Sequence, residues 1–301
     1  MLQIGGMLPR HPIPFDAFVA PARARPQLWR LGLGLVLIAA VHMALSTGLF
    51  IALMRLAGPE EGLTAETLGA TPGMMVVLLF SFAGLVLGAW LAVRLLHRRG
   101  LGSLIGHGPT ALRHFMAGAG VILVLHGAAF LLAGAQLELS PNLALTLWLA
   151  WLPVALLGVV VQTGAEELVF RGYMQQQLAA RFASPVVWMV LPSIGFGLLH
   201  HDPGAMGANT WLVVGLTGLF GLIAADLTAR SGTLGLAWGL HFANNCFALL
   251  LVAPVGPLSG LALYNVPFGM DDTEVMRGLL LVDLVLLGLV WAVCRLALRR
   301  G

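Results

Sequence analysis

The chain has 301 residues, of which 59% are hydrophobic and only 10% are charged. A soluble domain carries about 25% charged residues, so this composition excludes an ordinary soluble enzyme and favours a polytopic helical membrane protein. All 16 basic residues are arginines, and no basic cluster interleaved with aromatic residues is present, so we expect no nucleic-acid partner.

The first 28 residues are rich in proline and arginine and contain no apolar core. They predict a flexible cytoplasmic leader over residues 1–28, followed by a single transmembrane domain over residues 29–301. The first apolar run lacks a small-residue cleavage signature, so we interpret it as a retained span and not as a cleaved signal.

Eight apolar runs follow, each close to the length that a bilayer-crossing helix needs. We therefore predict an all-α fold of about eight transmembrane helices. The fourth run is expected to continue past the membrane as a glutamine-rich amphipathic stretch over 173–182. The runs cover residues 30–54, 72–96, 112–134, 143–166, 185–201, 210–228, 233–253 and 277–298.

The arginines predict the orientation. If the N-terminus is inside, 14 of the 16 lie at cytoplasmic ends, and the acidic loops near Glu60 and Asp271 fall outside. Positively charged loops stay in the cytoplasm. The sequence therefore predicts an integral inner-membrane protein with both termini in the cytoplasm.

The fourth run ends in two adjacent carboxylates, Glu166 and Glu167, followed by Arg171. Charged groups at membrane depth are costly unless they are paired or face a wet cavity. Glu167 and Arg171 are four residues apart and can pair on one helix face. Glu166 lies about 100° around the helix from Glu167, so it needs another partner, such as a histidine, a water or a substrate.

Two further polar clusters interrupt the apolar second half of the chain. Phe196 and His200 end the fifth run, and His241 and Asn245 lie four residues apart on one face of the seventh. Other intramembrane polar residues have simpler interpretations. His42 and His126 stand alone on apolar helices, Asp226 can pair with Arg230, and Asp283 has no explanation from the sequence.

These clusters can be combined into a hydrolytic site. Glu166 and His200 could deprotonate a water held between them, while His241 and Asn245 could donate hydrogen bonds to the oxyanion. The rival hypothesis is a Zn²⁺ ion held by Glu166, His200 and His241, although no H-E-x-x-H motif is present and we assign no metal or other cofactor.

The ordered set E-E-x-x-x-R, F-x-x-x-H and H-x-x-x-N resembles the CPBP family of intramembrane proteases, which includes the CAAX prenyl endopeptidases and bacteriocin-processing or immunity proteins. The resemblance covers residues 150–253. It implies helices around an intramembrane cavity and endoproteolysis without a covalent intermediate, with Glu166, His200, His241 and Asn245 as catalytic residues. Glu167 and Arg171 are then supporting residues.

Three functions remain open from the sequence. The first is an intramembrane endopeptidase that acts on a peptide or membrane-tethered protein. The second is a non-catalytic membrane scaffold or bacteriocin immunity protein. The third is a proton-coupled transporter that uses Glu166 and the histidines as a relay.

Overall fold

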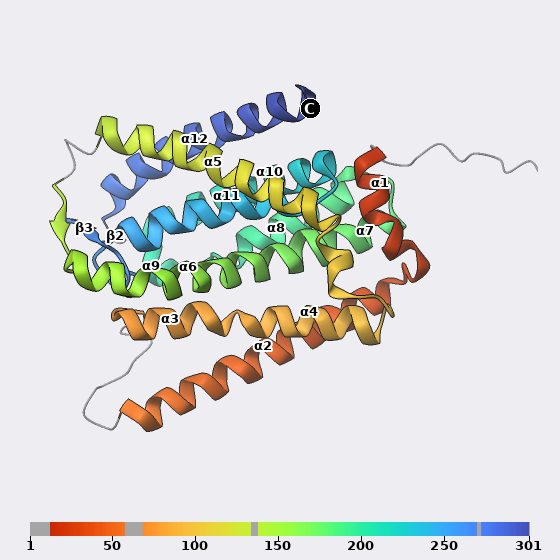
Figure 1. Ribbon diagram of the computed structural model, residues 1–301, viewed down its shortest axis with the longest axis horizontal. Coiled ribbons are helices and arrows are strands. Elements are labelled where there is room, and N and C mark those ends of the chain that lie inside the picture. Colours follow the sequence, from red (N-terminus) through yellow and green to blue (C-terminus); the bar gives the residue numbers. More distant parts are fainter. Residues whose placement is uncertain (1–12, 58–68, 134–137, 270–271, 301) are drawn as a thin grey trace, which may run out of the picture.

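The computed structural model describes residues 13–57, 69–133, 138–269 and 272–300, and these ranges are mostly helical (Figure 1). The predicted acidic loop around Glu60, together with Asp271, lies outside the described residues. The helices are α1 (Ile13–Val19), η1 (Ala20–Ala24), α2 (Leu28–Ala57), α3 (Pro72–Ser81), α4 (Ala83–Leu95), η3 (Leu101–Leu104), α5 (Gly108–Ala133), α6 (Leu145–Glu167), η4 (Leu168–Gln175), α7 (Gln176–Arg181), η5 (Val186–Val190), α8 (Leu191–Leu198), α9 (Pro203–Met206), η6 (Gly207–Asn209), α10 (Thr210–Ser231), α11 (Gly235–Cys246), η7 (Phe247–Leu251) and α12 (Thr273–Arg300).

The predicted all-α polytopic membrane fold is confirmed. Each of the eight predicted apolar runs coincides with an apolar helix. Two of these, Val186–Leu198 and Gly235–Leu251, are only about 20 and 26 Å long, less than the bilayer core of about 30 Å. The first contains Phe196 and is followed by His200, and the second contains His241 and Asn245. Within the described ranges, six segments are long enough to cross a membrane: Leu28–Arg55, Pro72–Leu95, Gly108–Leu132, Leu145–Arg181, Pro203–Ser231 and Thr273–Arg299.

The predicted flexible leader is wrong for its described part. From Ile13 the chain forms α1 and η1, and the side chains of Phe15, Phe18 and Val19 are buried. The Phe15 ring packs against Trp188, with the ring centroids 4.7 Å apart. The apolar spacing of residues 15, 18 and 19 is that of one helix face. Burial of this apolar face stabilises the helix, although the segment is rich in proline and arginine. Residues 1–12 of the predicted leader lie outside the described residues.

The fourth helix continues past residue 166, as expected, but the polar residues of its continuation do not face water. α6, the π-helix η4 and α7 form one unbroken helical segment from Leu145 to Arg181. Tyr173, Gln175, Gln176 and Gln177 are buried instead of facing water. Glu166 therefore lies about 22 Å from the end of the segment, well inside the helical layer. This depth lets it meet residues of the fifth and seventh predicted spans.

Glycines bring the central helices into close contact. A Cβ on Gly239 of α11 would overlap the backbone carbonyl of Phe115 in α5, and one on Gly235 would overlap that of Ala111. α8 and α10 approach in the same way at Gly197, where a Cβ would lie 2.5 Å from the Val214 carbonyl oxygen. Small residues allow such backbone approach between membrane helices, and here they hold the motif-bearing helices together.

A small sheet closes the end of the molecule opposite α1 and α7 (Figure 1). Its strands are β1 (Ser140–Pro141), β2 (Val252–Pro254) and β3 (Tyr264–Val266), in the order β1-β3-β2. β1 is antiparallel to β3, and β2 is parallel to it. The sheet ties the loop before α6 to the chain that follows η7.

Candidate active site

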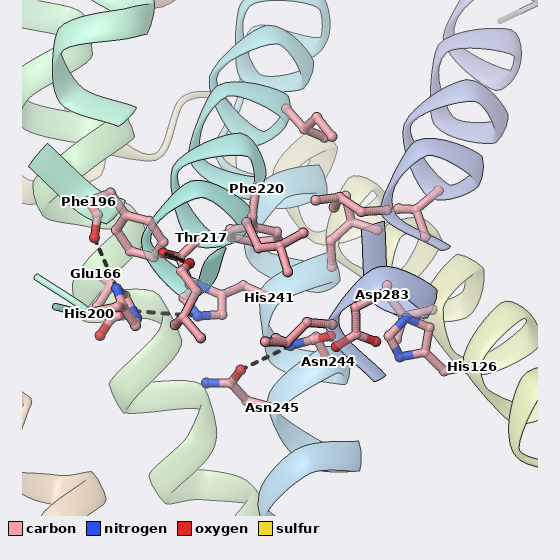
Figure 2. Close-up of a pocket in the computed structure, with 18 of the residues that line it drawn as sticks. His126, Glu166, Phe196, His200, Thr217, Phe220, His241, Asn244, Asn245 and Asp283 are labelled. Carbon is pink, nitrogen blue, oxygen red and sulfur yellow. Dashed lines mark hydrogen bonds and ion pairs between the residues drawn. The ribbon is translucent and has the colours of Figure 1, made fainter. Parts of the chain in front are cut away.

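A cavity of about 230 Å³ lies among α5, α6, α8, α10, α11 and α12 (Figure 2). Its lining includes Glu166 from α6, His200 from the turn after α8, and His241 and Asn245 from α11. The structure therefore brings together all four residues that the sequence analysis placed in a hydrolytic site, although they come from three separate segments. The remaining lining is mostly apolar and comes largely from α10 and α12.

The predicted pair of Glu167 and Arg171 is present behind the cavity. Arg171 Nη1 lies 3.0 Å from Glu167 Oε1, and both side chains are almost completely buried, with exposed fractions of 2% and 0%. The Arg171 guanidinium also lies over the ring of Phe196, 4.6 Å from its centroid. An aromatic face attracts a cation, so Phe196 links this ion pair to the helix that leads to His200.

His241 lies between the two carboxylates. Its Nδ1 is 2.9 Å from Glu167 Oε1, and its Nε2 is 3.4 Å from Glu166 Oε2. A carboxylate oxygen only accepts, so Nδ1 carries the hydrogen that bonds to Glu167. This contact fixes the orientation of the ring and directs Nε2 toward Glu166. This contact was not expected from the sequence, which indicated His241 as an oxyanion donor or, in the rival hypothesis, a zinc ligand.

His200 is held by a different bond. Its Nδ1 lies 2.9 Å from the carbonyl oxygen of Phe196, one turn earlier in the chain. The carbonyl can only accept, so Nδ1 is the donor, and the neutral ring carries a lone pair on Nε2. Because His200 lines the cavity, it can offer this nitrogen to a water or to a substrate hydrogen. The F-x-x-x-H spacing is thus the spacing of this local hydrogen bond.

Gln162 is a site residue that the sequence analysis missed. Asn245 Nδ2 donates to Gln162 Oε1 at 2.8 Å, and both side chains line the cavity. Gln162 stands one helical turn before Glu166, on the same face of α6. That spacing is the signal that could have identified it. The amide of Asn245 has a second N–H, which this bond leaves available.

The histidines named in the rival zinc hypothesis make hydrogen bonds and ion pairs within the protein. Among residues 13–57, 69–133, 138–269 and 272–300, no three His, Cys, Asp or Glu side chains are arranged to hold a metal ion. His241 directs both ring nitrogens to carboxylates, and His200 turns one of its two to a backbone carbonyl.

Comparison with known proteins agrees with the motifs. Residues 146–247 match the family model described as Rce1-like, the type II CAAX prenyl endopeptidase Rce1-like family. The match includes Glu166, His200, His241 and Asn245, and it confirms the resemblance to CPBP intramembrane proteases for this segment. A stretch of 121 residues is 31% identical to the uncharacterized protein YyaK of Bacillus subtilis (strain 168). It covers 40% of this chain and 39% of that protein, so the similarity spans about two fifths of the relative's length.

Proposed function

We propose that this multi-pass membrane protein is an intramembrane endopeptidase in which Glu166 and His200 activate water. The observation that carries the proposal is that Glu166, His200, His241 and Asn245 line one cavity inside a bundle of apolar helices. The similarity of residues 146–247 to CAAX prenyl endopeptidases supports a proteolytic function. The substrate is a peptide or a membrane-tethered protein that reaches the cavity from the bilayer or from the end of the molecule with α1, α7 and the end of α4.

Glu166 is the base in this proposal. Its side chain is 15% exposed, whereas that of Glu167 is fully enclosed and engaged with Arg171, so only Glu166 can reach a water in the cavity. A water between Glu166 and His200 Nε2 gives up a proton to the carboxylate as its oxygen attacks the peptide carbonyl carbon. Glu166 then returns the proton to the leaving amine as the C–N bond breaks.

Two donors can stabilise the oxyanion. The free N–H of Asn245 is one, since Gln162 holds the other N–H and so orients the amide. His241 is the second: its Nδ1–H stays on Glu167, and its Nε2, 3.4 Å from Glu166 Oε2, is the ring nitrogen on the cavity side that would donate to the oxyanion. Such donors act where negative charge develops in the transition state. No acyl-enzyme is needed, because water attacks directly.

The test is a cleavage assay in vesicles with a library of membrane-anchored peptides, with products identified by mass spectrometry. We expect wild-type protein to release products and Glu166→Gln to be at least about 100-fold slower, since general bases contribute about 10²–10⁴-fold. Glu274→Gln, which removes an exposed carboxylate at the start of α12, is the matched control and should cleave normally. If neither wild type nor any variant releases products, the result would favour a non-catalytic scaffold. Flux that depends on pH, without cleavage products, would favour a transporter.

A further inference from the structure

The wall of the cavity opposite His200 carries a second polar group of side chains. It consists of Asp283 from α12, His126 from α5 and Asn244 from α11, and none of them belongs to the three motifs. Figure 2 shows these side chains directed into the same part of the cavity, away from Glu166 and His200. Asp283 and His126 also lie outside the segment that matches the protease family. The mechanism proposed above leaves all three unused.

Asp283 has no protein partner among the described residues, in contrast to the other intramembrane aspartate. Asp226 accepts hydrogen bonds from Arg230 at 2.8 Å, Arg295 at 3.2 Å and Trp291 at 3.0 Å. For Asp283, no hydrogen bond or ion pair to the described part of the chain is found, and the side chain is exposed at the edge of the cavity. It lies ten residues into α12, about 15 Å along the helix. A carboxylate at such depth is costly without a partner, and such residues are functional by default.

The charges of the cavity indicate which partner would fit. Among the described residues, two carboxylates line it, those of Glu166 and Asp283, and no arginine does. Arg171 lies behind the wall and is engaged by Glu167. The ring of His126 packs on the ring of Phe247, with the ring centroids 5.7 Å apart. A cavity lined by carboxylates in a medium of low dielectric attracts a cation strongly and repels an anion.

The two polar walls lie along one helix face. His241, Asn244 and Asn245 are spaced i, i+3 and i+4 on α11, so their side chains point to one side of it. Asn244 Nδ2 lies 3.4 Å from Asn245 Oδ1, which continues the polar strip from the candidate catalytic residues toward Asp283. One peptide bound along this face can therefore contact both walls.

We propose that Asp283, with Asn244 and His126, forms a specificity subsite that binds the basic side chain of a peptide substrate. The inference rests on the proposed function only because it calls the bound peptide a substrate. The predicted binding itself does not require cleavage. A lysine side chain entering from the bilayer would place its ammonium on the Asp283 carboxylate and leave its neighbouring peptide bond nearer to Glu166. An acidic side chain at the same position would be excluded.

Binding to matched peptides tests the subsite. The probes are leucine–alanine peptides of about 20 residues, long enough to span a bilayer, with one central lysine, norleucine or glutamate. Wild-type protein in neutral-lipid nanodiscs should bind the lysine peptide at least about tenfold more tightly than the norleucine peptide, and the glutamate peptide least tightly, because an unpaired charge in a low-dielectric site is costly. Asp283→Asn should bind the lysine and norleucine peptides equally. Glu274→Gln removes one carboxylate from the exposed start of the same helix and should keep the preference.

Equal binding of the three peptides to wild type, no binding of any of them, or a lysine preference that survives in Asp283→Asn would overturn the proposal. Asp283→Glu guards against misfolding, since it keeps the charge and should keep the preference. Glu166→Gln separates the two hypotheses. This variant should lose cleavage and keep the lysine preference. A lysine preference without cleavage by wild type or any variant would contradict the proposed protease function and still support the subsite.

Discussion

At the scale of single residues, Glu167 at the end of α6 joins three elements, because its partners Arg171 and His241 lie in η4 and α11. Its Oε1 accepts from Arg171 Nη1 at 3.0 Å and from His241 Nδ1 at 2.9 Å. A fully buried carboxylate with two such partners orients both of them. Glu167 therefore fits the supporting role that the sequence analysis predicted, and it does so by fixing a proposed catalytic ring as well as an ion pair.

Arg171→Ala should destabilise the protein in detergent by about 3–5 kcal/mol, because it leaves the Glu167 charge buried without its cation. Thermal or denaturant unfolding measures this change. Arg277→Ala is the matched control, since Arg277 pairs with Glu274 on the surface and its side chain is 45% exposed. A surface pair contributes about 0–1 kcal/mol. If Arg171→Ala instead unfolds like wild type and still loses cleavage, Arg171 acts directly on the substrate.

Gln162 and Asn245 should behave as a positioning residue and a catalytic residue. Asn245→Ala is expected to lower kcat by about 10²–10³-fold, the usual cost of one oxyanion donor. Gln162→Met keeps the length of the side chain but removes the acceptor at 2.8 Å, so kcat should fall by a smaller factor with KM nearly unchanged. Steady-state kinetics separate the two effects. A rise in KM alone would show that Gln162 contacts the substrate instead.

At the scale of helices, the close approach of α5 and α11 positions His241. A Cβ at Gly239, two residues before His241, would overlap the Phe115 carbonyl. Gly239→Ala should therefore separate the helices, destabilise the protein by at least about 1–3 kcal/mol and reduce cleavage. Gly120→Ala in α5 is the control, because a Cβ there meets no atom within 4 Å. Equal melting temperatures for the two variants would contradict this packing.

The end of α4 is joined to the fourth helical segment by a buried histidine. His97 Nε2 donates to the Tyr173 hydroxyl at 2.9 Å, and Gln177 donates to Nδ1 at 3.0 Å. Burial lowers the pKa of His97 from 6.5 to about 4, and the nearby charge of Arg99 acts in the same direction. The unfolded chain thus binds more protons than the folded one between these values. This contribution to stability is complete above pH 6.5 and is lost as the pH falls toward 4.

We expect the melting temperature of wild type to fall between pH 6.5 and 4 more steeply than that of His97→Asn, which cannot titrate there. The comparison of slopes removes the constant cost of the substitution and the contributions of other acidic groups. Parallel melting curves for the two proteins over this range would show that His97 is not held in its neutral form.

Helix positions were predictable from the sequence, whereas helix ends and side-chain partners were less so. Each of the eight apolar runs coincides with one helix or with consecutive helical segments. The fourth helix extends past residue 166 as expected, but its glutamines are buried by neighbours remote in sequence, such as Phe18, whose carbonyl accepts from Gln176. Periodicity cannot reveal such partners. The same limit hid the contact between His241 and Glu167, which joins residues 74 positions apart.

At the scale of the whole molecule, the arginine distribution predicts that α1, α7 and the end of α4 face the cytoplasm and that the small sheet faces outward. In a variant without Cys246 and Cys294, a cysteine at exposed Ser140 should react with a membrane-impermeant thiol reagent in intact cells. A cysteine at exposed Gly102 should react only after permeabilisation. The reverse labelling pattern would show the opposite orientation, with α1, α7 and the end of α4 outside.

The central claim is that water activated at Glu166 attacks the peptide bond directly. The most direct measurement is cleavage of a membrane peptide in H₂¹⁸O with hydroxylamine present, followed by mass spectrometry of the new C-terminus. We predict one ¹⁸O atom in that carboxyl group, no hydroxamate, and at most trace product from Glu166→Gln. A hydroxamate product would reveal an acyl-enzyme, and normal cleavage by Glu166→Gln would place the base elsewhere; either result would contradict the account.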